Sequence, residues 1–266
     1  MNSNIGIVGL GVVGSALKNG FEKIGYKVKI HDLKLNTTIQ DIIETNAVFL
    51  CLPTPSRCDG SCDLSIIENV IEELTSQKYN GIIIIKSTVV PGTTKNFIDR
   101  YNESKICFVP EFLRERCAEY DFVENQELLA IGTESEEIFE FVKKIHGDLP
   151  KKILKLKPTE AELLKYFSNT FNALRIVFAN EFFDICKYLS VDYKEIKNSY
   201  DYLTSMHYSY LNCSEDLRGF GGACLPKDVK ALDCFIAQHN LNLKLFSNIL
   251  EENSKFHITV FEGMRK

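Results

Sequence analysis

One cysteine, Cys224, stands where a thiol could act as a nucleophile. Gly221-Gly222 precedes it and Leu225-Pro226 follows it. Because proline is favoured in the first turn of a helix, this run predicts a helix that starts at Cys224. The unpaired N–H groups of a helix start favour a thiolate over a thiol, and Asp228 would lie one turn along the same face. The run therefore indicates an activated nucleophile, although most cysteines are small buried hydrophobic residues.

A second chemical pattern lies near the N-terminus. The run Gly9-Leu10-Gly11-Val12-Val13-Gly14 follows an apolar strand signal at 5–8 and precedes a helical stretch. A second strand signal, 27–31, ends at Asp32. This order is typical of a dinucleotide site in which the pyrophosphate meets a helix N-terminus and the acid accepts a ribose hydroxyl. Asp32 would repel a 2′-phosphate, so we expect NAD, while a glycine-rich turn without a ligand is the alternative reading.

Short apolar runs and helical stretches alternate through the first half of the chain. The strand signals lie at 5–8, 27–31, 47–52, 82–85, 106–109 and 128–131, and the helical stretches between them at 39–45, 65–77, 93–101 and 134–146. This alternation predicts an α/β domain with a doubly wound parallel sheet over residues 1–155.

The second half, 156–266, predicts an all-helical domain. Apolar residues at spacings of three and four over 158–189 indicate one long helix, with Thr159 as N-cap and Glu162 as its capping-box partner. Further helices are expected at 192–200, 226–238 and 242–263. The long helix has more aromatic surface, at Phe171, Phe178, Phe182 and Phe183, than a small domain covers, which is consistent with a homodimer through this helix.

Composition excludes several classes of partner. The net charge of −5 provides no basic surface for nucleic acid or anionic membrane. No apolar run reaches membrane-spanning length, and we expect no export signal. The nine cysteines have no framework spacing, so we expect reduced thiols in a cytoplasm. Cys58 and Cys62 lack a second ligand pair, and no metal is expected.

Several further motifs occur in a fixed order. They lie at 52–55 with 63–65, at 86–94, at 110–115, at 161–170 with 178–181, and at 219–228. Together with the glycine run, they resemble the UDP-glucose/GDP-mannose dehydrogenase family over essentially the whole chain. The resemblance implies NAD-dependent oxidation of a nucleotide sugar at its 6-hydroxyl, in two steps, through a cysteine-bound thiohemiacetal and thioester.

The resemblance also implies roles for particular residues. Cys224 would be the nucleophile, and Lys165 and Asn169, one turn apart on the long helix, would stabilise the oxyanions at C6. Asp228 would hold the catalytic water or the lysine, Thr88 would bind the same water, and Glu111 would be the base in thioester hydrolysis. Without the motif, Lys165 and Asn169 would be interpreted as the solvated face of a helix. Glu111 and Glu115 would be interpreted as ordinary surface or capping acids.

The remaining site residues follow from the same motifs. The expected cofactor-binding residues are Gly9, Gly11, Val12, Val13, Gly14, Asp32, Pro53, Thr54, Thr88 and Glu115. The expected substrate-binding residues are Glu111, Phe112, Leu113, Arg114, Lys165, Asn169, Tyr210, Asn212 and Gly221. Tyr200, Tyr202, Tyr208 and Tyr210 could stack on a base or sugar, but half-buried packing is the plainer interpretation.

Two departures from the family pattern affect these expectations. The arginine of an Arg-Ile-Gly-like segment before Tyr210 is missing, and Arg218 sits at a different place. The third domain, which provides much of the nucleotide site in the family, is also expected to be absent, with 241–265 as the helix that would lead into it. Two alternatives stay open: a two-electron β-hydroxyacid dehydrogenase that has no need of Cys224, and a catalytically silent NAD-binding module.

Overall fold

The chain folds into two compact units. The computed structural model describes residues 4–101, 105–203, 213–240 and 244–258. One unit comprises Met1–Pro55 and Cys62–Lys165, and the other comprises Ser56–Ser61 and Tyr166–Lys266. The border between the units falls inside the longest helix.

The first unit is built on a seven-stranded sheet with the order β2-β1-β3-β4-β5-β6-β7. Its strands are β1 (Asn4–Val8), β2 (Lys27–His31), β3 (Ala47–Leu50), β4 (Ile82–Ile85), β5 (Ile106–Phe108), β6 (Leu129–Gly132) and β7 (Ile153–Leu156). Every neighbouring pair is parallel except β5 and β6. The predicted α/β class is confirmed, with strands interleaved with helices as the apolar pattern indicates.

Two features of this sheet differ from the sequence prediction. Strand β6 runs antiparallel to β5. The connection over residues 109–128 therefore begins and ends at the same end of the strands, and it does not have to cross the sheet. Strand β7 was not predicted at all. This strand has only four residues, Ile-Leu-Lys-Leu, and lysines on both sides of it hide its short apolar pattern, at the edge of the sheet where lysine is common.

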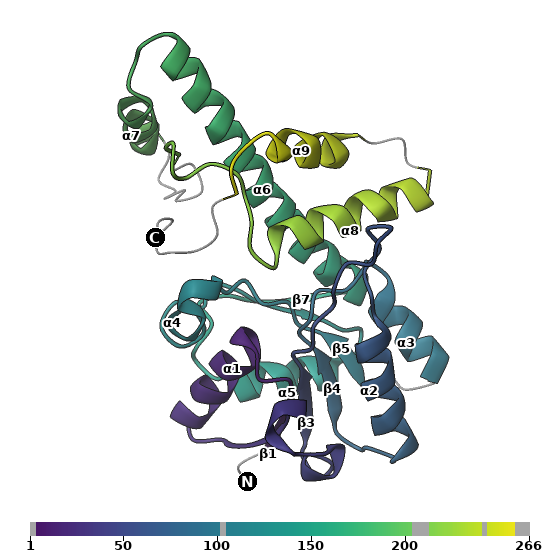
Figure 1. Cartoon of the computed structure of the whole chain (residues 1–266). Coiled ribbons are helices and arrows are strands. Elements are labelled where there is room, and N and C mark those ends of the chain that lie inside the picture. Colours follow the sequence, from purple (N-terminus) through teal and green to yellow (C-terminus); the bar gives the residue numbers. More distant parts are fainter. Residues whose placement is uncertain (1–3, 102–104, 204–212, 241–243, 259–266) are drawn as a thin grey trace. The chain divides into compact units, whose positions relative to one another are not determined.

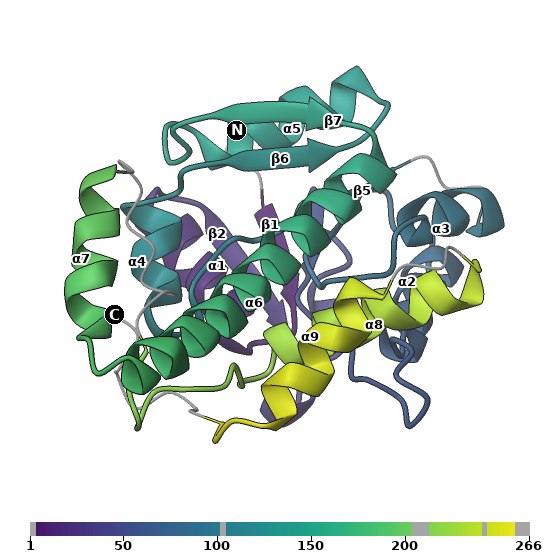
Figure 2. The same cartoon turned by 90° about the horizontal axis from the view of Figure 1, so that it is seen from above.

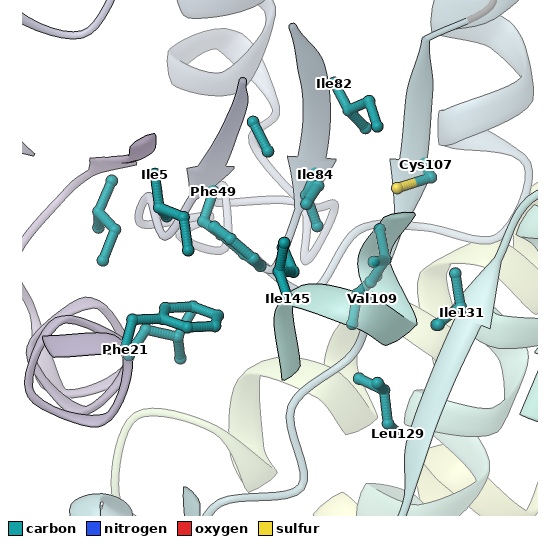
Figure 3. Packing of buried hydrophobic residues seen from close by; sticks show 14 of the residues in the cluster. Ile5, Phe21, Phe49, Ile82, Ile84, Cys107, Val109, Leu129, Ile131 and Ile145 are labelled. Carbon is teal, nitrogen blue, oxygen red and sulfur yellow. The ribbon is translucent and has the colours of Figure 1, made fainter. Parts of the chain in front are cut away.

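Helices cover both faces of this sheet (Figure 1). One face packs against α1 (Val12–Lys23), α4 (Ala118–Val123) and α5 (Glu136–His146), and the other against α2 (Ser65–Ser76) and α3 (Thr93–Tyr101). Figure 3 shows the first face, where Ile5, Phe49 and Ile84 lie on the side of Phe21 and Ile145. The four isoleucines of β4 alternate between the two cores, so this strand is buried on both faces.

The second unit is helical. It contains most of α6 (Pro158–Tyr188), together with α7 (Tyr193–Leu203), α8 (Leu225–Gln238) and α9 (Leu245–Ser254). Its core joins Ala173, Ile176 and Val177 of α6 to Val229 of α8 and Ile249 of α9. Figure 2 shows these three helices, drawn in green to yellow.

The predicted capping box of α6 is wrong. The helix begins at Pro158, so Thr159 lies inside its first turn and not before it, and Glu160 accepts the N–H of Lys157 at 2.8 Å. Glu162 instead accepts hydrogen bonds from the first turn of α3: from the N–H of Gly92 at 2.6 Å, and from the N–H and hydroxyl of Thr94 at 2.8 and 2.6 Å. A buried carboxylate on one helix thus caps another.

Two predicted helices are shorter than expected. The stretch 39–45 forms only a short 3-10 turn, Ile39–Asp41, capped by the carboxylate of Asp41 on Thr38. The helix expected over 241–265 ends at Ser254 in the described residues. Near this end, the Asn253 side chain bonds the backbone N–H and C=O of Phe220, and the carbonyl of His257 accepts the N–H of Gly219.

Candidate active site

The glycine turn between β1 and α1 has the geometry of an anion site. Gly9 has φ +90°, and a Cβ there would lie 2.5 Å from the carbonyl oxygen of Cys51. A Cβ on Gly14 would lie 1.9 Å from the carbonyl oxygen of Gly9, whereas Gly11 faces open space. Gly11 is the N-cap of α1 and provides no side-chain cap, so the first-turn N–H groups, including those of Val12 and Val13, suit a phosphate. These residues fit the pyrophosphate of a dinucleotide.

Asp32 ends β2 and holds the glycine turn. One carboxylate oxygen accepts the N–H of Leu10 at 2.7 Å, and the other accepts the N–H of Lys34 at 2.8 Å. These two hydrogen bonds lower the pKa of Asp32, so it is a carboxylate at neutral pH. A carboxylate beside the turn fits a ribose hydroxyl and disfavours a 2′-phosphate.

The ends of β3 and β4 are tied together beside this turn. The hydroxyl of Ser87 donates to the carbonyl of Leu50 and accepts the N–H of Leu52. The hydroxyl of Thr54 donates to the carbonyl of Thr88 at 2.9 Å. Both threonines are buried, and Pro53 is exposed. The segments that follow β3 and β4, which are expected to contact cofactor and water, are therefore hydrogen-bonded to each other at the carboxyl ends of these strands.

Lys165 and Glu111 form a buried ion pair within the first unit. The ammonium of Lys165 lies 3.0 Å from Oε1 of Glu111 and donates to the Glu111 carbonyl oxygen at 2.8 Å. Their side chains are only 6% and 11% exposed, and the ammonium lies 5.8 Å from the centroid of the Phe112 ring. The structure thus brings Lys165 of the 161–170 motif to Glu111 and Phe112 of the 110–115 motif.

The segment after Glu111 is fixed by an acid that the sequence interpretation missed. Asp121 on α4 accepts the backbone N–H of Arg114 at 2.8 Å, its Nε at 3.0 Å and its Nη2 at 2.7 Å. Leu113 packs against the core of the first unit, and Glu115 begins a 3-10 turn, Glu115–Cys117. The guanidinium of Arg114, expected to line a sugar site, is held by Asp121.

Lys86 is a second residue that sequence reasoning passed over, although it opens the 86–94 motif. It follows β4 directly, and only 2% of its surface is exposed. Burial lowers its pKa to about 8, against the opposing effect of Glu111. The burial of this lysine and the electrostatic effect of Glu111 on its pKa appear only in the folded chain.

In the second unit, Cys224 lies where the sequence predicts it. It is the N-cap of α8, its side chain is exposed, and its carbonyl accepts the N–H of Asp228 at 2.9 Å. The Asp228 side chain, 1% exposed, accepts a hydrogen bond from the amide of Asn169 on α6 and lies 3.2 Å from the ammonium of Lys227. Gly221 is half-buried beside Gly222, which has φ +77°.

Arg218 is held by contacts within the second unit. Its Nε donates to Asn180 at 2.7 Å, and its guanidinium lies between the rings of Phe183 and Phe256, at 5.1 and 4.6 Å from their centroids. The group is buried and joins α6 to the segment after α9. Tyr208, Tyr210 and Asn212 lie outside the described residues.

The exposed aromatic face of α6 differs in part from the expected one. Phe167, Phe171 and Phe178 are exposed, and the first two stack with their centroids 6.3 Å apart. Phe183 instead contacts Tyr193 and Arg218, and the side chain of Phe182 is not among those described.

Comparison with protein families confirms the family resemblance that the motifs indicate. The NAD binding domain of the UDP-glucose/GDP-mannose dehydrogenase family matches residues 28–149, and the central domain of that family matches 159–255. The chain is 32% identical to UDP-glucose 6-dehydrogenase of Rickettsia bellii over 81% of its length, and 33% identical to that of Haloferax volcanii over 75%. It spans about half the length of these curated relatives, 51% and 50%.

Solved structures show the same fold. A UDP-glucose dehydrogenase from Pyrobaculum islandicum superposes with a TM-score of 0.87 at 26% identity, covering 96% of this chain and 68% of that one. A 3-hydroxyisobutyrate dehydrogenase of Mycobacterium tuberculosis gives 0.73 at 15% identity, covering 96% and 94%. The second likeness concerns the fold alone. Within the described residues, no helix combines the length and apolar character needed to cross a membrane, and no cluster of three metal-ligating side chains occurs.

Proposed function

Because the chain belongs to the UDP-glucose/GDP-mannose dehydrogenase family, we propose that it oxidises the 6-hydroxyl of a nucleotide sugar to the carboxylate with NAD. The observation that carries this proposal is the exposed Cys224 at the start of α8, with the buried Asp228–Asn169 pair one turn along. A simple alcohol dehydrogenase has no use for such a thiol. An oxidation that passes through an aldehyde does, because the thiol holds the aldehyde for a second oxidation.

The first unit fits the cofactor. The turn formed by Gly9, Gly11, Val12, Val13 and Gly14 would receive the pyrophosphate, and Asp32 the adenosine ribose. Pro53, Thr54, Thr88 and Glu115 would line the rest of the site. When bound, NAD supplies the hydride acceptor for each oxidation.

The proposed chemistry takes place on the sugar C6 and on Cys224. Removal of a hydride and a proton from the alcohol gives an aldehyde. The Cys224 thiol adds across its C=O bond, the sulfur to C6 and the proton to the oxygen, to form a thiohemiacetal. Removal of a second hydride and proton gives a thioester. Water then releases the carboxylate and returns the thiol, with Glu111 as the base. Two hydrides leave for each acid formed.

The other proposed catalytic residues would stabilise negative charge or hold the catalytic water. The Lys165 ammonium and the Asn169 amide, one turn apart on α6, would stabilise the oxyanions that develop at C6. Asp228, which already accepts from Asn169, would orient this amide and hold the catalytic water, and Thr88 would bind the same water. Phe112, Leu113, Arg114, Gly221, Tyr210 and Asn212 would contact the sugar nucleotide.

We further propose that residues 1–155 serve as the NAD-binding domain and 156–266 as a helical domain that forms a homodimer. The exposed rings of Phe167, Phe171 and Phe178 on α6 support this assembly, since contiguous apolar side chains on a helix mark interaction surfaces. The substrate is a UDP- or GDP-sugar, in keeping with the family.

The test is turnover of a panel of UDP- and GDP-hexoses with NAD by this chain. The expected result is two NADH for each sugar acid, and loss of acid formation in Cys224→Ala. The matched control is Cys58→Ala, which removes another exposed thiol and should leave turnover unchanged. Full activity of Cys224→Ala would select a two-electron β-hydroxyacid dehydrogenase. NAD binding without turnover of any sugar nucleotide would indicate a silent module.

A further inference from the structure

Asp121 binds both the main chain and the side chain of Arg114. Its carboxylate accepts the backbone N–H of Arg114 at 2.8 Å and the guanidinium Nε and Nη2 atoms at 3.0 and 2.7 Å. The thiol of Cys117 donates to the same carboxylate at 3.7 Å. Burial by itself would favour the neutral acid, but the hydrogen bonds from Arg114 lower the pKa of Asp121, so it is an anion at neutral pH. Two parallel hydrogen bonds to a carboxylate hold a guanidinium in one orientation.

The helix that carries Asp121 is itself fixed in the first unit. Phe122, the next residue of α4, is fully buried in the core. It packs so closely on α1 that a Cβ at Gly20 would lie 2.2 Å from its ring. At the surface, the Asn19 amide of α1 donates to Glu119 of α4 at 2.9 Å. The Asp121 carboxylate therefore stands on a firmly packed element and can serve as a fixed point.

Arg114 lies three residues after Glu111, in a segment that is neither helix nor strand over 109–114. Before this segment, the N–H of Val109 donates to the carbonyl of Ile85 at 2.9 Å, where the sheet ends. After it, Arg114 is bonded to Asp121. Because the chain spans only about 3.5 Å per residue, two such anchors leave the backbone of Glu111 little freedom.

Lys165 gives Glu111 a further contact, but one that the proposed reaction would disturb. In the structure, its ammonium contacts the carbonyl and the carboxylate of Glu111. During each oxidation the same ammonium would be drawn toward the oxyanion at C6, and its contacts with Glu111 would weaken. The hydrogen bonds of Asp121 involve no group that is expected to react, so they can persist throughout the reaction.

We propose that Asp121, by clamping Arg114, is a positioning residue for Glu111. The inference rests on the proposed function, in which Glu111 is the base that releases the acid from Cys224. The clamp keeps this base in place while Lys165 contacts the substrate. Since Glu111 is needed only for hydrolysis of the thioester, a loosened clamp slows that step and spares both hydride transfers.

The first test measures hydrogen exchange and needs no turnover. The backbone amides of Arg114 and Cys117 are the reporters, because the first donates to Asp121 and the second to the Arg114 carbonyl at 3.0 Å. In Asp121→Asn the ionic pair is lost, so a peptide covering 110–117 should exchange about tenfold faster or more by mass spectrometry, relative to a peptide from β3 that reports global unfolding. Glu119→Gln, on the exposed side of the same helix, is the matched control and should exchange like wild type.

Equal exchange of the 110–117 peptide in Asp121→Asn and wild type would overturn the clamp. If Asp121→Asn does not fold, Arg114→Lys replaces it, since lysine keeps the positive charge but cannot form the two parallel hydrogen bonds. Faster exchange in Arg114→Lys then supports the clamp, and exchange like that of wild type contradicts it.

The second test separates the steps of the turnover reaction. In Asp121→Asn the first turnover should still release two NADH per active site, while the steady-state rate falls about tenfold or more. Mass spectrometry of the quenched variant should find the acyl group on Cys224. Glu119→Gln should match wild type in both phases.

An unchanged steady-state rate in Asp121→Asn would contradict the positioning role. So would equal losses in the first turnover and the steady state, because they indicate a smaller fraction of active protein. If the wild-type chain turns over no sugar nucleotide, the proposed function fails, and the exchange comparison still decides whether Asp121 holds the segment that contains Glu111.

Discussion

The carboxylate of Asp32 accepts the main-chain N–H of Leu10 at 2.7 Å, across the turn that joins β1 to α1. Asp32 also accepts the N–H of Lys34, in the 3-10 turn Leu33–Leu35 that follows β2. The residue expected to recognise the ribose is therefore also the residue that shapes the phosphate-binding turn. If Asp32 binds the ribose as proposed, cofactor choice and loop structure depend on the same carboxylate.

Replacing Asp32 should consequently not convert the chain to NADP. In Asp32→Asn, the amide group would face either the Leu10 or the Lys34 N–H, and one acceptor is lost. We expect the Kd for NADH to rise about tenfold or more with no gain in NADPH binding, measured by fluorescence titration. Asp41→Asn, which removes a comparable cap on the Thr38 turn, should leave NADH binding unchanged. Tight NADPH binding by Asp32→Asn would show that the turn does not depend on this carboxylate.

Replacing Glu162 with a neutral residue should greatly reduce the free energy of unfolding. Its carboxylate is fully buried and accepts three hydrogen bonds from the start of α3. Glutamine keeps one acceptor oxygen and places an NH2 group against donors, so Glu162→Gln should reduce the free energy of unfolding by about 3 kcal/mol in urea denaturation. Glu160→Gln, on the exposed side of the same turn, should cost less than about 1 kcal/mol. Equal losses in the two variants would contradict the capping role.

His146 should make the protein lose stability on acidification at pH values well above those at which carboxylates are ordinarily protonated. Its ring is buried among Phe21, Phe49 and Phe122, and its Nε2 atom has no hydrogen-bond partner in the described structure. Burial lowers the pKa of His146 in the folded state to about 3, whereas an unfolded histidine has its ordinary value of about 6.5. Between about pH 3 and pH 6.5, the unfolded chain therefore binds a proton at this histidine that the folded chain does not bind. Stability therefore falls by about 1.4 kcal/mol for each pH unit as the pH decreases through this window.

The measurement is urea denaturation of wild type and His146→Leu at pH 7 and pH 5. Wild type should lose about 2 kcal/mol more than the variant between the two pH values. His239→Leu, an exposed histidine at the end of α8, should behave like wild type. A wild-type loss no larger than that of His146→Leu would show that His146 accepts a proton in the folded state.

The exposed aromatic rings of α6 give the proposed homodimer a direct test. Phe167 is 70% exposed and stacks on Phe171, so an aspartate at 167 would place a charge in the expected interface. Sedimentation at micromolar concentration should find a dimer for wild type and a monomer for Phe167→Asp. Tyr120→Asp changes an exposed aromatic residue on α4 and should remain dimeric. A monomeric wild type would remove the proposed assembly.

Local sequence patterns predicted much of the fold. The four isoleucines of β4, the apolar spacing of α6 and the Leu225-Pro226 start of α8 all have the structure that their pattern indicates. The failures share a cause. The four-residue strand β7 is defined by its pairing with β6 rather than by its own short pattern. Glu162 fits a local capping box although its partners lie about seventy residues away in the chain. Patterns of a few residues cannot reveal partners that folding supplies.

The sequence by itself determined the α/β class, the glycine turn with Asp32, and the place of Cys224 at a helix start, because each depends on backbone geometry over a few neighbouring residues. Only the tertiary structure decided how the charged side chains are used. It paired Lys165 with Glu111, tied Arg114 to Asp121, and buried Lys86 directly after β4. The physical reason is that burial sets the energy of a charge, and burial is a property of chain segments brought together from distant parts of the sequence.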